Sequence, residues 1–319
     1  MNEDCHMQVV VLMSTYNGER FIEEQVASIL AQLPPMGLLM VRDDGSTDTT
    51  AKKIYAFKDE RILLEEGRNI GFAKSFLTLL KNTPKNTQMV MFSDQDDVWL
   101  EGKVQRAWDC LSTLEDRPAL YCSRQMIADQ DLHIVEESTK KNSHPSFHNS
   151  LAENIVTGCT AAINERAIDL MKLAGVPERV EFHDWWLYLV ISAHGTVIAD
   201  DRALILYRQH ENNFIGRGTG LAGRFQKNIE FVIKNDWVNA LIGQIQELRE
   251  NYWFSLTIGN KKIIEKYVEF SGDQSCAQWE FIFSRRRWIE DPFRDLIFRC
   301  LLLIHRVKKK ARNFRLSFY

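Results

Sequence analysis

The chain has 319 residues, of which 45% are hydrophobic and 26% are charged. These proportions are ordinary for a folded globular protein and exclude a disordered chain, and the length suits one large domain or a catalytic domain with a smaller second one. The formal net charge is −3, but residues 285–319 carry eleven Lys or Arg against three acids. The body of the chain is therefore acidic and its tail is basic.

The cysteines and the apolar segments indicate a protein of the cell interior. The six cysteines are scattered, with neither a CxxC pair nor a zinc-ligand spacing, which is typical of reduced thiols. The N-terminus lacks the apolar stretch of a secretory signal, and the longest apolar run of the tail, residues 301–304, is too short to span a bilayer. We therefore expect a cytoplasmic protein.

The first hundred residues alternate between short apolar runs and amphipathic stretches. The apolar runs are rich in β-branched side chains, which favours buried strands, and the amphipathic stretches carry apolar residues at helical spacing. Strands are predicted at 8–13, 38–41, 62–65 and 89–92, and helices at 21–33, from 49, and at 71–80. This alternation predicts an α/β fold with a doubly wound, mostly parallel sheet.

Beyond residue 154 the pattern is more mixed, with helices predicted around 165–173 and 184–194 and a strand near 204–207. Four glycines between residues 216 and 223 indicate a junction, after which the chain becomes helical, aromatic and finally basic. We therefore expect a catalytic domain over residues 1–215 and a helical C-terminal region over residues 216–319.

Polar residues cluster just after three of the predicted strands, where an open α/β sheet binds its ligands. The cluster after the fourth strand is Asp94-Gln95-Asp96-Asp97. Three carboxylates within four residues repel one another unless a cation lies among them, and Mg²⁺ and Mn²⁺ prefer oxygen ligands. The sequence favours a divalent-metal site here over the alternative, a solvated acidic turn or helix cap.

A second cluster, Asp43-Asp44-Gly45-Ser46-Thr47-Asp48, follows the second predicted strand. Its later residues have a structural explanation, because Thr47 or Asp48 can cap the next helix and Gly45 can supply a turn with positive φ. The adjacent carboxylates of Asp43 and Asp44 can instead accept hydrogen bonds from a pyrimidine base or a ribose. The residues alone leave both interpretations open.

Four motifs resemble, in their order, those of glycosyltransferase family 2: Ser14-Thr15-Tyr16-Asn17-Gly18, Asp43-Asp44-Gly45-Ser46-Thr47-Asp48, Asn69-Ile70-Gly71-Phe72-Ala73 and Asp94-Gln95-Asp96-Asp97. The resemblance covers about residues 8–215 and implies a GT-A fold, which contains a Rossmann-like sheet. It also implies transfer of a sugar from a nucleotide donor with inversion at the anomeric carbon. The roles implied for single residues are Thr15, Tyr16 and Asn17 beside the nucleotide, Asp43 or Asp44 on the base, Asp94 on the ribose or the metal, and Asp96 as principal metal ligand.

An inverting transfer needs a base that removes the proton of the acceptor hydroxyl. Asp184 resembles the family's catalytic acidic residue in position, and that residue usually follows a Glu, which His183 replaces here. The alternative role for Asp184 is a cap for the helix that Trp185 and Trp186 begin. The two roles can coexist.

Further site residues are assigned by resemblance alone. They comprise His210 as another metal ligand, Arg208, Arg68 and Asn69 as contacts of the nucleotide sugar, and Gly158, Cys159 and Trp185 on the acceptor side. The alternative for His210 is a structural histidine, and the alternative for residues 157–160 is a tight turn between a strand and a helix.

The basic tail can form a helix with an apolar face flanked by Lys and Arg. This face comprises Trp288, Ile289, Phe293, Leu296, Ile297, Phe298 and residues 301–304. Such a helix suits an anionic membrane surface, where each basic residue contributes about 1 kcal/mol. We expect peripheral binding at the inner face of the cell membrane, with packing on its own domain or on a second copy in a homodimer as the alternative. No nucleic-acid-binding fold accompanies the basic residues, so we expect no nucleic-acid partner.

Within the family, the motifs DDGSTD, NIGFA, DQDDVW and YRQH resemble those of bacterial rhamnosyltransferases that build capsule, O-antigen or rhamnan. The resemblance implies dTDP-rhamnose as donor, with a UDP-sugar as the alternative, and a glycan or lipid-linked acceptor. A metal-dependent nucleotidyltransferase is a rival from another class, but it typically has an early glycine-rich loop with Arg and Lys, which residues 14–18 do not offer. A non-catalytic carbohydrate-binding protein is a second rival, which predicts loss of the acidic cluster or of Asp184, and both are present.

Overall fold

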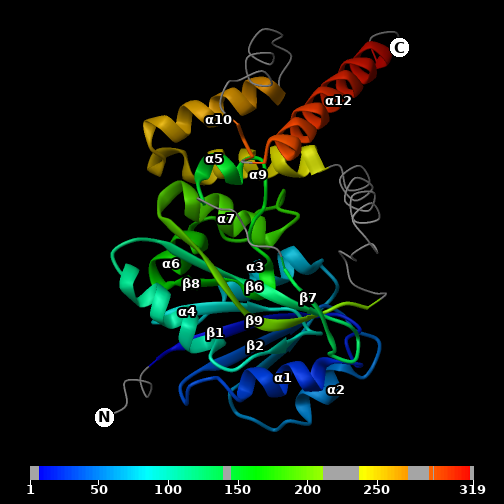
Figure 1. Ribbon diagram of the computed structural model, residues 1–319, viewed down its shortest axis with the longest axis vertical. Coiled ribbons are helices and arrows are strands. Elements are labelled where there is room, and N and C mark those ends of the chain that lie inside the picture. Colours follow the sequence, from blue (N-terminus) through cyan, green and yellow to red (C-terminus); the bar gives the residue numbers. More distant parts are fainter. Residues whose placement is uncertain (1–6, 139–144, 211–236, 272–286, 290, 317–319) are drawn as a thin grey trace.

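The computed structural model describes residues 7–138, 145–210, 237–271, 287–289 and 291–316. A central sheet carries helices on both of its faces, and the C-terminal helices stack on one side of this body (Figure 1). The predicted α/β fold is confirmed. The glycine-rich junction at 216–223, and with it the expected domain boundary, lies outside the described residues.

The first part of the sheet follows the predicted alternation. It contains the strands β1 (Val9–Thr15), β2 (Leu38–Asp43), β3 (Ile62–Glu66) and β4 (Met89–Ser93), connected by the helices α1 (Ile22–Leu30), α2 (Thr50–Tyr55) and α3 (Phe72–Lys81). β1 pairs in parallel with β2 and β4, and β2 pairs in parallel with β3. Parallel strands have their carboxyl ends at the same edge of the sheet, so the loops that follow β1, β2 and β4 meet there.

The remaining strands extend the sheet beyond β4, in the order β3-β2-β1-β4-β8-β6-β9-β5, with β7 paired to β6. They are β5 (Val98–Trp99), β6 (Ala119–Ala128), β7 (Ile134–Glu137), β8 (Ala162–Asn164) and β9 (Thr196–Arg208). β8 is antiparallel to β4 and β6, whereas β6 and β9 are parallel, so the sheet is mixed. The strand predicted at 204–207 is the end of the longer β9, and β5, β6, β7 and β8 have no predicted counterpart.

β1 is buried on both faces and separates two apolar cores. Val9, Val11 and Met13 join the core that contains α1 and α4 (Lys103–Leu111). Val10 and Leu12 join the other core, which contains α3, α6 (Glu165–Leu173) and α7 (His183–His194). Side chains alternate between the two faces of a strand, so a run of consecutive apolar residues can serve both cores.

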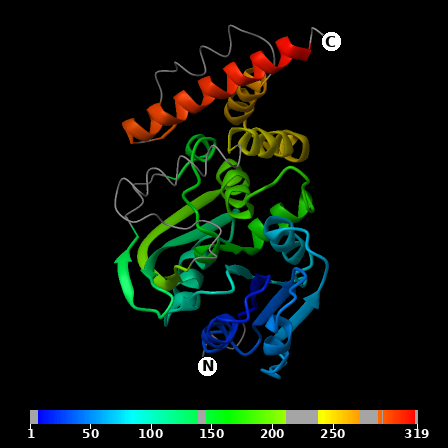
Figure 2. The ribbon, with the colours of Figure 1, turned by 90° about the vertical axis from the view of Figure 1, so that its right-hand side faces the viewer.

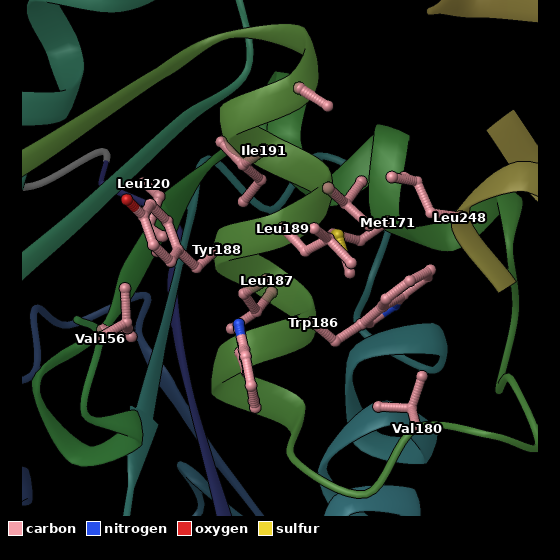
Figure 3. Packing of buried hydrophobic residues seen from close by; sticks show 14 of the residues in the cluster. Leu120, Val156, Met171, Val180, Trp186, Leu187, Tyr188, Leu189, Ile191 and Leu248 are labelled. Carbon is pink, nitrogen blue, oxygen red and sulfur yellow. The ribbon is translucent and has the colours of Figure 1, made fainter. Parts of the chain in front are cut away.

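α7 lies at the centre of the second core and is apolar around its whole circumference. Its residues from Trp185 to Ile191 are at most 1% exposed, and Figure 3 shows side chains of this helix packing near Met171 of α6 and Leu248 of α9. The short α5 (Phe147–Ser150) and α9 (Trp237–Tyr252) pack on α7, and α10 (Ile258–Ser271) and α12 (Pro292–Leu316) pack on α9 (Figure 2). A helix that is apolar all round must be covered on every side, so the C-terminal helices complete this core.

The apolar face predicted for the tail divides between this core and the surface. Four of its side chains are at most 6% exposed and belong to the core: Trp288, Ile289, Phe298 and Leu302. Three others on α12 are more than half exposed: Phe293, Leu296 and Ile304. The expectation that the whole face meets a membrane is therefore corrected for the four buried residues. None of the helices in the described ranges combines the length and the apolar character needed to cross a bilayer.

Candidate active site

A cavity of about 380 Å³ lies where the loops after β1, β2 and β4 meet. Its lining residues are Ser14, Thr15, Tyr16, Asp44, Asn69, Gly71, Phe72, Phe76, Asp94, Gln95, Asp96, Thr157, Gly158, Phe182, His183, Asp184 and Tyr207. Residues from all four predicted motifs and from the segment around Asp184 thus share one cavity, although they are far apart in sequence.

The loops after β1 and β2 are tied together by the side chain of Asp43. Its carboxylate accepts hydrogen bonds from Thr15 Oγ1 at 2.8 Å and from the backbone N–H and the hydroxyl of Ser46 at 2.8 and 2.6 Å. Asp43 is 2% exposed and does not line the cavity. The structure therefore gives Asp43 the structural role, and the assignment of this residue to the base is corrected.

Asp44 does line the cavity, and its carboxylate also organises the rim. It accepts the backbone N–H groups of Ile70 and Gly71, each at 2.9 Å, and forms an ion pair with Arg42. These contacts hold the loop that contains Asn69 at the edge of the cavity, where Asn69 is a lining residue.

Tyr16 lines the cavity with a half-exposed side chain, and its backbone is clamped by Gln95. Gln95 Oε1 accepts the N–H of Tyr16 at 2.9 Å, and Gln95 Nε2 donates to the Tyr16 carbonyl at 3.1 Å. Sequence reasoning assigned Gln95 no role of its own. Asn17 and Arg68 do not line the cavity, and Asn17 Oδ1 instead accepts the N–H of Thr47 at 2.9 Å.

Asp96 lines the cavity, and His210, which is not among the lining residues, lies beside its carboxylate. His210 Nε2 lies 2.8 Å from Asp96 Oδ2, close to the spacing of about 3 Å between adjacent ligands of an octahedral ion with bonds of about 2.1 Å. Asp94 lines the same cavity, and burial together with the charges of Asp96 and Asp184 raises the pKa of Asp94 to about 7. Carboxylates suit Mg²⁺, and a carboxylate with an imidazole suits Mn²⁺, but the ligand atoms of Asp94, Asp96 and His210 do not all come within 4.8 Å of one another.

A second acidic group lies beneath the loop. Ligand atoms of Asp94, Asp97 and Cys159 come within 4.8 Å of one another, as in a metal site. The ammonium of Lys103 is buried in the same place: it donates to the Cys159 carbonyl at 3.0 Å and lies 5.0 Å from the centre of the Trp99 ring. The positive charge of Lys103 would repel a metal ion bound to these three side chains. We therefore regard Lys103 itself as the cation that balances the charge of this group.

The pKa values of the inner group reflect the same balance. Burial lowers the pKa of Lys103 to about 8, while Cys159, Asp97 and Asp94 oppose that shift. Burial and the nearby carboxylates raise the pKa of Asp97 well above its usual value. Sequence reasoning assigned Lys103 no role; the structure places it at the start of α4, where the helix dipole disfavours a cation.

Arg208 does not face the cavity. Its guanidinium donates to the backbone carbonyls of Asp96 at 2.7 Å and Gln130 at 2.5 Å, forms an ion pair with Glu24, and lies 4.4 Å from the centre of the Phe21 ring. The residue is 2% exposed. Its assignment as a diphosphate contact is therefore corrected: Arg208 anchors the end of β9 to the acidic loop.

The start of α7, which carries Asp184, also lines the cavity. One oxygen of this carboxylate accepts the N–H of Trp185 at 2.7 Å. The charge of Asp184 contributes to the raised pKa of Asp94, so the two carboxylates interact electrostatically within the cavity. Asp184 is the second residue of α7, and Phe182, at the N-cap position, makes no side-chain capping hydrogen bond, so the capping interpretation of Asp184 is wrong. Its acidic side chain in the first turn still interacts favourably with the helix dipole.

Trp185 and Cys159 are core residues, which corrects their assignment to the acceptor side. Trp185 is 1% exposed, donates its indole N–H to the Ser150 carbonyl at 2.7 Å and packs on Trp237 with ring centres 4.8 Å apart. Cys159 is fully buried, whereas its neighbour Gly158 does line the cavity. Consecutive helical residues point about 100° apart, so Asp184 and Trp185 face different surroundings.

We expect Trp185→Phe to destabilise the protein and to leave its chemistry unchanged. The smaller ring leaves space in the core and removes the donor of the Ser150 carbonyl, which together cost about 2–4 kcal/mol. Urea unfolding measures this loss, and the sugar-transfer rate is compared per folded molecule. Trp253→Phe, at a half-buried tryptophan, is the matched control with a smaller loss. Reduced turnover at unchanged stability would return Trp185 to the active site.

Comparison with known proteins identifies the family. The model of Glycosyl transferase family 2 matches residues 10–169, half of the chain. A dTDP-rhamnosyl transferase, RfbG of Shigella flexneri, is 28% identical over 247 residues, which cover 73% of this chain and 83% of the relative. The UDP-Glc:alpha-D-GlcNAc-diphosphoundecaprenol beta-1,3-glucosyltransferase WfgD of Escherichia coli is 27% identical over 192 residues, which cover 60% of this chain and 72% of the relative.

Solved structures support the same fold. S. aureus TarS 1-349 in complex with UDP-GlcNAc superposes with a TM-score of 0.59 at 14% identity, covering 88% of this chain and 76% of that one. The mannosyltransferase PcManGT from Pyrobaculum calidifontis, in complex with GDP-Man and Mn²⁺, gives 0.55 at 16% identity, covering 100% and 83%. At these identities the likeness establishes the fold alone. With the family match, it follows that the chain belongs to glycosyltransferase family 2, has the GT-A fold and transfers a sugar from a nucleotide sugar.

Proposed function

We propose that the protein is an inverting, metal-dependent transferase that moves L-rhamnose from dTDP-rhamnose to a glycan or lipid-linked acceptor in the synthesis of capsule, O-antigen or rhamnan. The observation that carries this proposal is the presence of Asp184 in the same cavity as the acidic residues Asp94 and Asp96. A single displacement requires a base for the incoming hydroxyl and a separate group that stabilises the leaving diphosphate.

The donor nucleotide is assigned to the wall formed by Thr15, Tyr16, Asp44 and Asn69. The half-exposed ring of Tyr16 offers a face on which a pyrimidine can stack. Asp44 Oδ2 accepts the N–H of Gly71 and, as a carboxylate oxygen, has room for a second donor. The N–H of a thymine or uracil base is a donor of the right kind, so Asp44 is the base-reading carboxylate in this proposal.

The reaction is a proton transfer coupled to a substitution at carbon. Asp184 accepts the proton of the acceptor hydroxyl as the acceptor oxygen bonds to the anomeric carbon. The bond from that carbon to the diphosphate oxygen breaks, and its electron pair leaves with the nucleoside diphosphate. A divalent cation held by Asp96, Asp94 and His210 would stabilise the charge on the leaving diphosphate. Lys103 and Arg208 hold the acidic loop in place from the protein side.

The rhamnosyl donor is supported by similarity to the Shigella flexneri enzyme, and a UDP-sugar is the alternative because of the name of the Escherichia coli relative. The test is a panel of dTDP-rhamnose, dTDP-glucose, UDP-glucose and UDP-GlcNAc, each measured for Mn²⁺-dependent binding and slow hydrolysis. We expect the tightest binding and the fastest hydrolysis for dTDP-rhamnose. A preference for a UDP-sugar would replace the donor and keep the reaction class.

The C-terminal helix α12 is proposed to bind an anionic membrane surface. Its exposed side chains Phe293, Leu296 and Ile304 lie at spacings of three and eight residues, and residues 306–315 add six Lys or Arg in sequence. Apolar insertion and electrostatic attraction then act together.

Changing all three exposed residues to serine should weaken binding to vesicles that contain anionic lipid by about tenfold or more, because each loses an apolar contact of about 1 kcal/mol or more. Vesicle sedimentation measures this, and Leu173→Ser, at an apolar residue of α6 that is 74% exposed, is the control. Unchanged vesicle binding with a shift from dimer to monomer would assign the stripe to a homodimer interface instead.

A further inference from the structure

His183 lies in a box of aromatic rings at one end of the cavity. Its ring stacks on Phe76 with centres 4.1 Å apart, and the rings of Phe92 and Phe72 lie 5.6 and 6.1 Å away. His183 is 4% exposed, yet it is one of the lining residues of the cavity. A polar ring is thus held at the wall of the substrate cavity by apolar neighbours.

Neither ring nitrogen of His183 has a hydrogen-bond partner within the part of the chain that the structure describes. Burial lowers the pKa of His183 to about 3, so the imidazole is neutral and offers one donor and one acceptor. Buried polar groups in proteins are nearly always paired, because an unpaired one costs stability. Two unused nitrogens on one buried ring therefore call for a ligand or a function.

Gly158 packs directly against the imidazole ring of His183. A Cβ atom at this position would lie 2.8 Å from His183 Nε2, a distance that real Cβ contacts do not reach. Gly158 does not have a positive φ, so glycine is needed here because a side chain would clash with His183 and not because of the backbone conformation. Because Gly158 and His183 both line the cavity, the contact between them lies at the cavity wall.

The surroundings of His183 indicate which chemistry fits there. Phe72 and Phe182 are half-buried, line the same cavity and lie with ring centres 6.2 Å apart. A hydroxyl both donates and accepts and so matches a neutral imidazole, while phenyl rings favour an apolar group. Asp184 is the next residue along the chain, so this end of the cavity adjoins the proposed base.

We propose that His183 is a specificity-determining residue that hydrogen-bonds a hydroxyl of the donor's sugar, and that the neighbouring Phe72 and Phe182 rings receive the C6 methyl group of a 6-deoxyhexose. The proposal rests on the donor class proposed above and adds the residues that select it. It distinguishes His183 from a merely structural core histidine, whose replacement would leave sugar recognition unchanged.

The decisive variant is His183→Phe, which keeps an aromatic ring in the box and removes both nitrogens. It should be at least as stable as the wild type in thermal unfolding, because it removes an unpaired buried polar group. Its affinity for dTDP should stay within about twofold, and its affinity for dTDP-rhamnose should fall by about ten- to a hundredfold through the lost hydrogen bond. His183→Gln, which keeps a donor and an acceptor, should recover part of the loss.

A matched control is His194→Phe at the other end of the same helix. Both nitrogens of His194 have partners, the Val190 carbonyl at 2.8 Å and Ser255 Oγ at 2.9 Å. This variant should lose stability and keep the wild-type ratio of dTDP-rhamnose to dTDP affinity. Replacement by Phe should therefore leave stability unchanged or raised at His183 and lower it at His194. Only the replacement at His183 should weaken binding of the sugar.

The outcomes separate this proposal from that of the donor. Equal affinity of wild type and His183→Phe for the preferred nucleotide sugar would overturn the role of His183, whatever that sugar is. A wild-type preference for UDP-glucose or dTDP-glucose, whose sugars carry a C6 hydroxyl, would overturn the donor and the methyl contact. The hydroxyl contact would still be supported if His183→Phe lowered the affinity for the intact nucleotide sugar and left the affinity for the nucleoside diphosphate unchanged.

Discussion

Asp184→Asn should reduce sugar transfer by about 10²- to 10⁴-fold, the usual contribution of a positioned general base. The amide cannot accept the proton of the acceptor hydroxyl, but its oxygen can still accept the N–H of Trp185, which is bonded at 2.7 Å in the native protein. The fold and the donor site should therefore persist. Transfer of labelled sugar is measured at saturating donor, and dTDP affinity by calorimetry should stay within about twofold of the wild type.

Asp169→Asn is the matched control, because Asp169 is an exposed carboxylate on α6 and does not line the cavity. It should transfer sugar at the wild-type rate. A wild-type rate for Asp184→Asn as well would move the base to another group. Parallel loss of transfer and of dTDP affinity in Asp184→Asn would indicate a role in the structure of the site.

The parallel half of the sheet was predictable because its signals are local. Each of β1 to β4 is a short apolar run, and the loops after three of them carry the polar motifs, so sequence order and the geometry of parallel strands suffice to bring the motifs together. β6 and β9 are different: β6 contains Ser123, Arg124 and Gln125, and its partner strand begins about seventy residues later. Such pairing depends on contacts that no window of sequence contains.

The direction of individual side chains was the second limit. Asp43 and Asp44 are adjacent carboxylates, but Asp43 turns inward to Thr15 and Ser46 while Asp44 lines the cavity. Trp185 follows Asp184 in sequence and points into the core. Motif matching assigns a segment to a site, whereas packing decides which of its members reach the ligand.

The burial of the tail also depends on distant partners. Phe298 and Leu302 are apolar residues of an amphipathic helix, as are Phe293 and Leu296. The first two are covered within a core that includes α9, and the last two are exposed. Sequence shows that a helix has an apolar face and cannot show how much of that face its own domain covers.

Asp96→Ala should reduce the sugar-transfer rate about as much as Asp184→Asn does, but for a different physical reason. In Asp96→Ala the proposed metal site loses the carboxylate that lies 2.8 Å from His210. Loss of metal stabilisation on the leaving diphosphate is worth on the order of 4 kcal/mol, a factor of about a thousand in transfer rate. Because Arg208 bonds to the backbone carbonyl of Asp96 and not to its side chain, the loop should keep its anchor.

The measurement that distinguishes Asp96→Ala from Asp184→Asn is Mn²⁺ binding in the presence of dTDP, followed by calorimetry. Asp96→Ala should lose the metal-dependent part of nucleotide binding, whereas Asp184→Asn should keep it. Asp116→Ala, at an exposed aspartate paired with Arg117, is the control and should bind Mn²⁺ and dTDP like the wild type. If nucleotide binding by Asp96→Ala depended on Mn²⁺ as in the wild type, the metal would instead be assigned to the group of Asp94, Asp97 and Cys159. The ammonium of Lys103, which is buried beside that group, would then have to lose its proton or move away.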